Sequence, residues 1–383
     1  MRRLIIDGTV LVADRLSGIG HYLQGIVTEL DRKLASGEVT DVDASIVVSF
    51  DRAARLRPFG LRHIRVRRNP IPSKVMLTLT HEQRLPQMDR LFGRGIYFSP
   101  YFHTWPLRQS RAITTIHDLS FEEVPEYADD YNARFLRRAV KDTVARADVI
   151  ACDSRTMADK VAEFYGVDRE RIVLTHPAAD AAHFHRRPEH EVVEVLRRYG
   201  LAGRYFLSVG NIEPRKNQLS LIRAYLDLPQ DVRDEYGLVL LGSTGWKNGH
   251  ITRLVEEARR RGADIALLEG KVTDDDLPAV YSGAAALVFP SLYEGFGIPI
   301  VEAMMCGTPV VLSNVSVMPE VGGDAPLYVD PRSVSDIGGA LVAITRLTAG
   351  EREAMVERGF AQAARYSWSD TVDTLLTACR AIA

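Results

Sequence analysis

Two glutamates with seven residues between them, Glu294 and Glu302, lie in the stretch FPSLYEGFGIPIVEAMMCGTP at 289–309. The residues on both sides of Glu302 are apolar, and a helix that is apolar all round is normally buried. A buried carboxylate is costly unless something pairs with it. Because no Lys or Arg stands within helical reach of Glu302, its partner is predicted to be a ligand hydroxyl or a residue distant in the chain.

The turn between the two glutamates has the composition of a ligand-binding loop. Gly295 and Gly297 let the backbone approach a ligand without a Cβ in the way, and Pro299 suits the first turn of a helix. The N–H groups of Phe296, Gly297 and Ile298 would then lie at a positive helix end, which binds phosphate or sugar oxygens. An ordinary turn with two solvated glutamates is the alternative, and the apolar surroundings of the second glutamate argue against it.

A basic pair, Arg215–Lys216, follows a predicted strand at 205–210 and precedes a predicted helix within 211–228. Two cations at such a junction can neutralise a diphosphate leaving group. Arg–Lys pairs are common on protein surfaces, so the pair taken alone would be predicted to be an exposed surface feature.

His117 and Asp118 fall at the carboxyl end of a predicted strand at 112–116. In an open α/β sheet the ligand crevice lies at that end of the strands. A single His is more often structural than catalytic, but a His-Asp pair in this position favours a functional role.

Gly18 and Gly20 lie between a predicted strand at 2–7 and a predicted helix at 21–36. Strand, glycine loop and helix are the layout of a phosphate-binding turn. A G-x-G pattern is weak by itself, and an ordinary strand-to-helix turn explains it equally well.

The rest of the chain supplies the elements that would position these residues. Apolar runs alternate with helical periodicity along the whole sequence, which predicts an α/β fold made of two strand–helix series. The polar stretch 176–190 contains two prolines and predicts the linker between them. The other expected strands are 44–50, 148–152, 171–175, 238–242, 265–270, 284–290 and 310–312, and the other expected helices are 131–146, 154–165, 298–305, 338–344, 351–364 and 367–382.

The segment SLYEGFGIPIVEAMMCGTPVV (291–311) resembles the E-x7-E signature of the retaining glycosyltransferases of family four. Residues 205–217 and 112–121 support the resemblance, which covers nearly the whole chain and looks most like bacterial mannosyltransferases that build O-antigen and exopolysaccharide chains. It implies the GT-B fold, in which two Rossmann-like domains face a central cleft. The expected domains are 1–185 for the acceptor, 191–366 for the nucleotide sugar, and a terminal helix at 367–383 that packs back on the first domain.

The resemblance implies roles for the candidate residues. Glu302 would bind the ribose hydroxyls of a nucleotide-diphosphate sugar, and Glu294 would hold hydroxyls of the transferred sugar. His117 and Asp118 would lie beside that sugar and complete the catalytic set. The remaining donor-binding candidates, from the resemblance and from the turn, are Gly18, Gly20, Val272, Leu277, Phe296, Gly297 and Ile298. Transfer would proceed by same-face attack, with the leaving phosphate taking the proton of the acceptor.

The family's diphosphate clamp is a glycine followed by a basic pair, and here the sequence departs from the pattern. Many members have arginine directly after the glycine, where this chain has Asn211. Arg215 would supply the guanidinium instead, and the assignment among Asn211, Arg215 and Lys216 stays open. With cations in that role no metal and no other cofactor is expected. The triplet 274–276 (Asp-Asp-Asp) is predicted to be a helix N-terminus, where acids are favoured.

Composition limits the other possibilities. The 383 residues carry a formal net charge of -2, which argues against nucleic acid as a general partner. Cys152, Cys306 and Cys379 are odd in number and far apart, which argues against a disulfide framework or zinc site and fits a reducing compartment. Asp7 interrupts the apolar start and no apolar run approaches the roughly 20 residues of a membrane span. The expected location is the cytoplasm, including the inner face of the membrane.

The segment 52–111 is strongly basic, with 13 Lys and Arg residues against two acids, Glu82 and Asp89. Apolar and aromatic residues interleave the charges. Anionic lipid headgroups attract such a surface by about 1 kcal/mol per basic residue, which would suit a lipid-linked acceptor. A solvated basic surface explains the composition equally well.

Family likeness alone favours GDP-mannose as the donor, and UDP-glucose or another GDP-hexose stays open. A sugar-nucleotide epimerase of the same fold is the rival enzyme. A phosphorylase-like enzyme would need a lysine-bound cofactor, and no lysine has a suitable setting. A non-catalytic nucleotide-sugar-binding subunit is the third possibility, against which the presence of both Glu294 and Glu302 argues.

Overall fold

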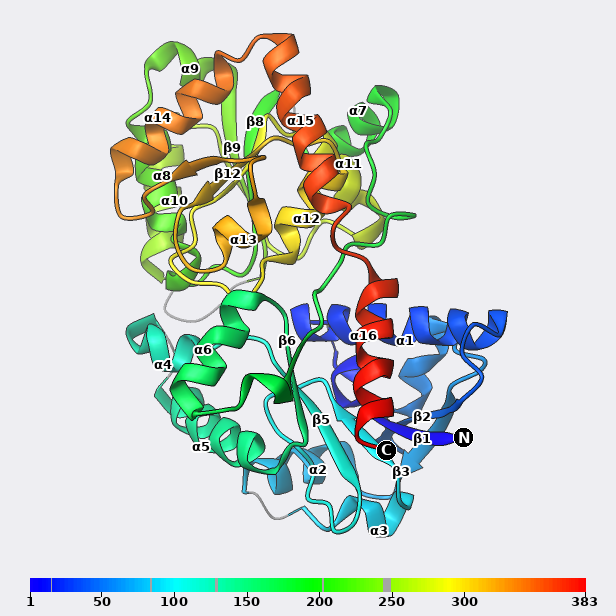
Figure 1. Ribbon diagram of the computed structural model, residues 1–383. Helices are drawn as coiled ribbons and strands as arrows, with labels where there is room; N and C mark the ends of the chain where they lie inside the picture. Colours follow the sequence, from blue (N-terminus) through cyan, green and yellow to red (C-terminus); the bar gives the residue numbers. More distant parts are fainter. Residues whose placement is uncertain (15, 83–84, 128–129, 202, 244–248) are drawn as a thin grey trace. The chain divides into compact units, whose positions relative to one another are not determined.

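The computed structural model describes residues 1–14, 16–82, 85–127, 130–201, 203–243 and 249–383. The chain forms two compact units (Figure 1). Unit 1 consists of Met1–Ala178 together with Ser367–Ala383, and unit 2 consists of Ala179–Tyr366. Each unit is built around one parallel sheet, which confirms the predicted α/β class with two Rossmann-like domains.

Within the described part of unit 1, seven parallel strands form a sheet in the order β3-β2-β1-β4-β5-β6-β7. The strands are β1 (Arg2–Asp7), β2 (Val42–Ser49), β3 (Arg65–Asn69), β4 (Ile96–Ser99), β5 (Arg111–Ile116), β6 (Val149–Cys152) and β7 (Ile172–Leu174). The helices are α1 (Gly18–Ser36), α2 (Ser73–His81), α3 (Met88–Phe92), α4 (Ser120–Glu123), α5 (Asp130–Arg146), α6 (Arg155–Tyr165) and α16 (Trp368–Ala381).

Helix α1 shows how the sequence determines the packing of unit 1. Its apolar residues recur at helical spacing, so one face of the helix is buried. Ser17 caps its first turn, and Gly37 ends it in the left-handed conformation. The buried face of α1 joins residues of β1, β2 and α16 in one apolar core.

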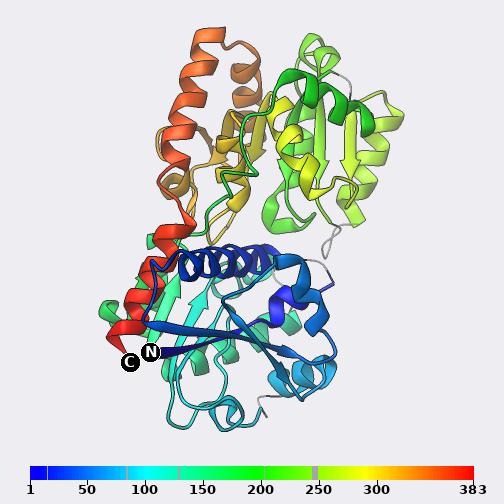
Figure 2. The same cartoon turned by 90° about the vertical axis from the view of Figure 1, so that its right-hand side faces the viewer.

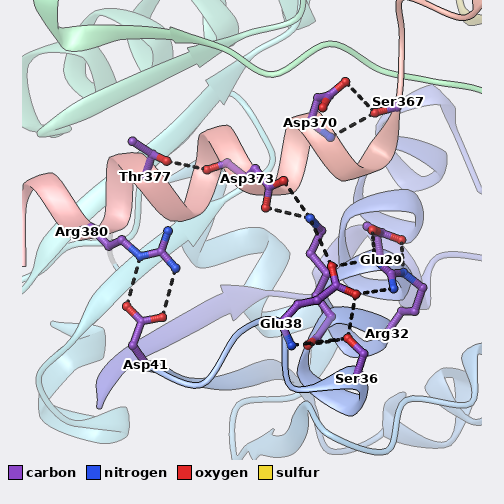
Figure 3. A network of polar contacts seen from close by, with 11 residues as sticks. Glu29, Arg32, Ser36, Glu38, Asp41, Ser367, Asp370, Asp373, Thr377 and Arg380 are labelled. Carbon is purple, nitrogen blue, oxygen red and sulfur yellow. Dashed lines mark hydrogen bonds and ion pairs between the residues drawn. The ribbon is translucent and has the colours of Figure 1, made fainter.

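The C-terminal helix α16 packs beside α1 in unit 1 (Figures 1 and 2). Its first residue, Trp368, fills a notch at Gly25, where a Cβ would come within 2.1 Å of the indole ring. Farther along, the buried Lys33 Nζ of α1 donates to Asp373 Oδ1 at 2.7 Å (Figure 3). The last turn adds two hydrogen bonds from Arg380 to Asp41. Apolar burial and ion pairs therefore hold the chain terminus on unit 1.

Among the described residues of unit 2, six parallel strands form a sheet in the order β10-β9-β8-β11-β12-β13. The strands are β8 (Arg204–Val209), β9 (Tyr236–Leu241), β10 (Ile265–Leu268), β11 (Ala286–Phe289), β12 (Val310–Ser313) and β13 (Leu327–Val329). The helices are α7 (Glu189–Arg198), α8 (Gln218–Leu226), α9 (Gln230–Glu235), α10 (Gly249–Arg260), α11 (Leu277–Gly283), α12 (Ile298–Met305), α13 (Met318–Gly322), α14 (Val334–Thr345) and α15 (Ala349–Ala363).

The order of the unit 2 strands reverses between β8 and β11. The chain adds strands on one side of β8 up to β10 and then returns to build β11, β12 and β13 on the other side. In open α/β sheets ligands bind outside the carboxyl ends of the strands at such a switch point. The loops that follow β8 and β11 are therefore the ones expected to bind a ligand.

Three strands were missed by the sequence analysis, namely β3, β4 and β13. β3 is an edge strand that carries three arginines in five residues, so it lacks the apolar run of the buried strands. Charged side chains on an edge strand discourage pairing with other chains. β4 and β13 are short strands of four and three residues.

The boundary between the units falls after Ala178, inside the predicted linker 176–190. The residues that follow it bond to unit 2, since His183 Nε2 lies 2.9 Å from Asp274 O and Arg187 N donates to Ser282 Oγ. Judged by these contacts, unit 2 begins at Ala179. The sequence analysis ended the first domain at 185 and began the second at 191.

Candidate functional site

The loop after β11 carries Glu294 and leads into α12. The helix spans Ile298–Met305 with Pro299 in its first turn, as the sequence predicted. Gly297 precedes it with a φ of +95°, a backbone conformation that favours glycine. A Cβ on Gly297 would also come within 2.8 Å of Ile300 Cδ1. This glycine therefore sets the direction in which the loop enters the helix.

The buried carboxylate of Glu294 is bound by two cations from the loop after β8. Lys216 Nζ donates to its Oε1 at 2.6 Å, and Arg215 Nη1 donates to its Oε2 at 2.8 Å. Burial opposes ionisation of Glu294, but the charges of Arg215 and Lys216 hold its pKa below the usual value. The first glutamate and the basic pair thus form one site at the carboxyl ends of neighbouring strands.

A second buried carboxylate, Glu213, binds the same guanidinium. Arg215 Nη2 donates to Glu213 Oε1 at 2.8 Å. Burial raises the pKa of Glu213, although the charges of Arg215 and Lys216 act in the opposite direction. Sequence analysis did not consider Glu213, even though it stands two residues before Arg215.

Hydrogen bonds hold the two loops of this site against each other. Leu292 N donates to Arg215 O at 2.9 Å. Asn217, whose φ is +59°, donates from Nδ2 to the carbonyl oxygens of Pro290 and Pro331 at 3.0 and 2.7 Å. Because Asn217 is buried, these bonds replace the water that its amide would otherwise bind. The basic pair and Glu294 are therefore positioned by the backbone as well as by their charges.

Of the three clamp candidates, Asn211 has a partner outside this ion cluster. Its side chain is exposed, and its carbonyl oxygen accepts a hydrogen bond from Gln218 Nε2. Arg215 and Lys216, in contrast, both contact Glu294.

Glu302 on α12 has a neutral partner. Tyr281 OH on α11 donates to Glu302 Oε2 at 2.8 Å. Burial raises the pKa of Glu302 to about 7, with the hydrogen bond from Tyr281 opposing and the charge of Asp274 adding to the rise. The sequence predicted a ligand hydroxyl or a distant residue as partner, and the structure supplies a residue 21 positions earlier.

The other donor-binding candidates of unit 2 pack in or against its apolar core. Phe296 is buried, and its ring packs edge-on against Tyr366. Val272, Leu277 and Ile298 are partly buried against the same apolar core. The role of Val272 in donor binding stays a prediction.

The acidic triplet at 274–276 forms a short 3₁₀ turn, which confirms its prediction as a helix N-terminus. Thr273 Oγ1 caps the turn by accepting from Asp276 N. Arg198 and Tyr199 donate to the Asp276 carboxylate. Throughout the described ranges, no three His, Cys, Asp or Glu side chains are grouped as metal ligands would be.

His117 lies at the end of β5 in unit 1, and both nitrogens of its buried ring have partners. Nδ1 lies 2.7 Å from Asp153 Oδ2, and Nε2 lies 2.9 Å from Pro100 O. Burial opposes a charge on the imidazole, but the carboxylate of Asp153 raises the pKa of His117. Pro100 O can only accept a hydrogen bond, so Nε2 carries a proton and donates to it. In the charged form of the ring, Nδ1 also carries a proton and donates to Asp153. Both ring nitrogens of His117 are thus already engaged, and the carboxylate of Asp153 favours the charged form of the ring.

Asp118 faces a different partner from its neighbour. Its Oδ1 accepts from the N–H and the hydroxyl of Ser120 at 3.0 and 2.8 Å, at the start of α4. The two residues of the predicted His-Asp pair therefore do not bind each other.

Gly18 and Gly20 lie in the first turn of α1, so the loop predicted over these two residues is wrong. Helix α1 starts at Gly18 because Ser17 Oγ accepts from Gly20 N and caps the turn earlier than expected. A Cβ on Gly20 would come within 2.9 Å of Leu16 Cδ2, whereas Gly18 has open space around it. Their proposed contact with a phosphate stays a prediction.

Sequence analysis did not identify four of the side chains that hold these groups in place. These are Asp153, Glu213, Asn217 and Tyr281. Asp153 follows β6 directly, as His117 follows β5, and the two strands are neighbours in the sheet. Position at a strand end was therefore a signal that would have found Asp153.

Comparison with known proteins identifies the class. The family model for glycosyl transferases group 1 matches residues 200–362, and the model for glycosyltransferase family 4 matches residues 95–183. The O-antigen chain mannosyltransferase B of Escherichia coli is 35% identical over 382 residues, which cover 98% of each chain. The O-antigen chain mannosyltransferase RfbU of Salmonella typhimurium is 31% identical over 243 residues, or 63% of this chain and 62% of that protein.

A solved structure shares the fold. HepE of Anabaena, crystallised with UDP and glucose, superposes with a TM-score of 0.75 over 100% of both chains at 14% identity. The two-unit fold and the matched models together define a glycosyltransferase with a GT-B fold. The chain belongs to the group 1, family 4 glycosyltransferases.

Proposed function

We propose that this glycosyltransferase is a retaining enzyme that moves mannose from GDP-mannose to a saccharide or lipid-linked acceptor in surface polysaccharide synthesis. The observation that carries the proposal is the Glu294 carboxylate held between Arg215 and Lys216. A carboxylate that can accept from sugar hydroxyls and cations that can neutralise a diphosphate stand in one site. The names of the two O-antigen mannosyltransferases support mannose as the sugar and a polysaccharide as the product.

In this proposal, unit 2 binds the donor. Glu302 accepts from the ribose hydroxyls, and Glu294 accepts from hydroxyls of the hexose. The bond between C1 and the β-phosphate oxygen breaks while the acceptor oxygen bonds to C1 on the same face. The proton of the acceptor hydroxyl passes to the leaving phosphate. Arg215 and Lys216 stabilise the charge that develops on the diphosphate, which is the role a metal has in other transferases.

Unit 1 binds the acceptor in this proposal. The two ring nitrogens of His117 are already engaged by Asp153 and Pro100. Its role is then to orient the transferred sugar or the acceptor electrostatically rather than to exchange protons. Asp118 is assigned to the same task, whereas Gly18 and Gly20 in the first turn of α1 stay candidates for donor binding.

The first experiment measures binding and turnover with a panel of nucleotide sugars. GDP-mannose should raise the thermal stability of the protein more than UDP-glucose or another GDP-hexose, because a ligand at 100 times its Kd stabilises the folded state by about 2.7 kcal/mol. Addition of a mannose-terminated acceptor should release GDP. Glu294→Ala should abolish this release while the chain stays folded.

The same assay separates the rival functions. An epimerase would convert the sugar without net release of nucleotide, and a binding subunit would show a thermal shift without turnover. Stabilisation by UDP-glucose alone would reject GDP-mannose as donor. Full activity of Glu294→Ala would reject the role assigned to that residue.

The basic segment 52–111 gives a further element of the proposal, contact with an anionic membrane surface that carries the acceptor. β3 displays arginines on the edge of the unit 1 sheet, and Arg84 of this segment lies outside the described residues. Three of the eight large hydrophobic residues exposed in the described structure, Val66, Val75 and Leu91, come from this segment, and Phe50 stands two residues before it. None of the described helices has the length and apolar composition needed to cross a membrane.

Vesicle binding tests this element. Replacing Arg65, Arg67 and Arg68 of β3 with Ser should weaken cosedimentation with phosphatidylglycerol vesicles by about 1 kcal/mol per residue. Replacing three exposed arginines of unit 2 (Arg197, Arg260 and Arg261) with Ser is the matched control and should leave binding unchanged. If the β3 variant binds like the parent protein, or if both variants lose binding equally, this face is not the membrane contact.

A further inference from the structure

The second carboxylate of the ion cluster, Glu213, has no role in the transfer described above. It is the most buried member of the cluster, with a side chain 2% exposed against 7% for Glu294. Its Oε1 accepts from Arg215, but its Oε2 has no hydrogen-bond partner in the described part of the chain. A buried carboxylate with an unpaired oxygen is costly. Its presence beside the basic pair therefore calls for a function.

The four charges of the cluster are connected in a line. Glu213 binds Arg215, Arg215 also binds Glu294, and Glu294 binds Lys216. Two negative and two positive charges balance, so the cations are already neutralised before any donor arrives. The side chains of Arg215 and Lys216 are each 14% exposed, which makes them the members of the cluster most accessible to a ligand.

The two cations are anchored differently. Arg215 has Glu213 on Nη2, and on Nη1 it has Glu294 and the carbonyl oxygen of Tyr293. Lys216 binds Glu294 and lies 5.0 Å from the centroid of the Phe289 ring. An incoming diphosphate can therefore capture Lys216 by displacing one carboxylate oxygen, whereas Arg215 stays fixed by its deeper partner.

We propose that Glu213 is a positioning residue that fixes Arg215, and that the donor diphosphate takes Lys216 from Glu294. The exchange rests on the proposed function of this site. It frees Glu294 Oε1 to accept from hydroxyls of the transferred sugar at the moment the diphosphate is bound. Before the donor binds, the charged side chains of the site pair with one another. Binding of the diphosphate then makes Glu294 available to the sugar.

The exchange predicts that Glu294 weakens the binding of the diphosphate. Affinities for GDP and UDP, and for GMP and UMP, would be measured by calorimetry at pH 8 on the full chain. Glu294→Gln should bind the diphosphate about tenfold more tightly than the parent protein, since one charge-assisted hydrogen bond no longer competes. The change should be much smaller for the monophosphate. Glu257→Gln, an exposed glutamate on α10, is the control and should change neither affinity.

A double variant locates the competition. In a Lys216→Gln background, Glu294→Gln should lose most of its tenfold gain, because the two residues then have no interaction to break. Lys216→Gln alone should weaken diphosphate binding, which is the opposite of the effect expected for Glu294→Gln. This variant therefore tests the exchange even if Glu294→Gln fails to fold. Unchanged or weaker diphosphate binding by a folded Glu294→Gln protein overturns the exchange.

The positioning role of Glu213 has its own readout. Glu213→Gln keeps an oxygen that can accept from Arg215 Nη2 and should retain transfer within about threefold of the parent, whereas Glu213→Ala should lose at least about tenfold in kcat. Equal activity of the two variants overturns the positioning role. If the parent protein binds neither GDP nor UDP, both the proposed function and the exchange fail. If it binds one of them but Glu294→Gln binds no more tightly, only the exchange fails.

Discussion

The buried charges of unit 2 and those of unit 1 are organised in opposite ways. In unit 2, Glu294 shares two cations whose side chains are each 14% exposed, so a ligand can reach them. In unit 1, the His117 and Asp153 side chains are 9% and 7% exposed, and each nitrogen of the imidazole has a partner within 3 Å. The first cluster can change its partners, whereas the second is closed.

This difference separates two uses of an ion pair. A buried pair that is fully enclosed costs much when one partner is removed, because the other charge remains without compensation. A pair at the edge of a site loses less, because water or a ligand replaces the missing partner. We therefore expect the unit 1 pair to contribute mainly to structure and the unit 2 cluster mainly to binding and transfer.

The largest expected effect tests this difference through stability. Asp153→Ala leaves the His117 imidazole buried with no acceptor at Nδ1, and it should lower the free energy of unfolding by about 3–5 kcal/mol. Glu294→Ala leaves Arg215 bonded to Glu213, and should cost clearly less. Urea unfolding of both variants, with hydrogen exchange at β5 and β6 to isolate unit 1, measures the two losses.

A second variant separates the loss of the hydrogen bond from the effect of the cavity that alanine leaves. Asp153→Asn keeps an oxygen that can accept from His117 Nδ1 and should recover part of the loss. The comparison between the units fails if Asp153→Ala is no less stable than Glu294→Ala. It also fails if the alanine and asparagine variants are equally destabilised, because the charge and hydrogen bond would then be irrelevant.

The sequence analysis succeeded where local chemistry determines local structure. The limits of α12 followed from its apolar run, from Pro299 in the first turn and from the glycine before it. The helix expected at 154–165 was likewise correct, since Ser154 caps the first turn of α6 and Gly166 ends it in the left-handed conformation. In each case the residues that make the feature are neighbours in the chain, so their pattern is visible without the fold.

The partners of the site residues could not be predicted in this way. Tyr281 reaches Glu302 from another helix, and Asp153 reaches His117 from a neighbouring strand. Which strand ends become neighbours depends on the order of the sheet, and the alternation of strands and helices does not specify that order. The arginines of β3 show the converse case, because the sequence analysis recognised a basic surface there but predicted no strand.

The last and smallest expected effect is a pH dependence that compares two glutamates of unit 2. Glu294 is paired with cations, whereas Glu302 is paired with the neutral Tyr281. Burial raises the pKa of Glu302 to about 7. If Glu302 binds the ribose hydroxyls as proposed, a proton would compete with them for the carboxylate near neutral pH. GDP-mannose has both phosphates esterified and does not itself titrate in this range. Its affinity should therefore fall by about tenfold for each pH unit below 7 and level off above pH 8.

Glu302→Gln is the control, since its amide has no proton to lose. It should bind GDP-mannose more weakly than the parent at pH 8 and with little dependence on pH. The same raised pKa means that the folded state binds an extra proton between about pH 4.5 and 7, so this residue's contribution to stability is present at low pH and lost as the pH rises through about 7. Glu302→Gln should remove that slope. A parent protein whose affinity and stability are both flat from pH 5.5 to 8 would show that Glu302 is ionised throughout, and that Tyr281 stabilises its charge as the cations do for Glu294.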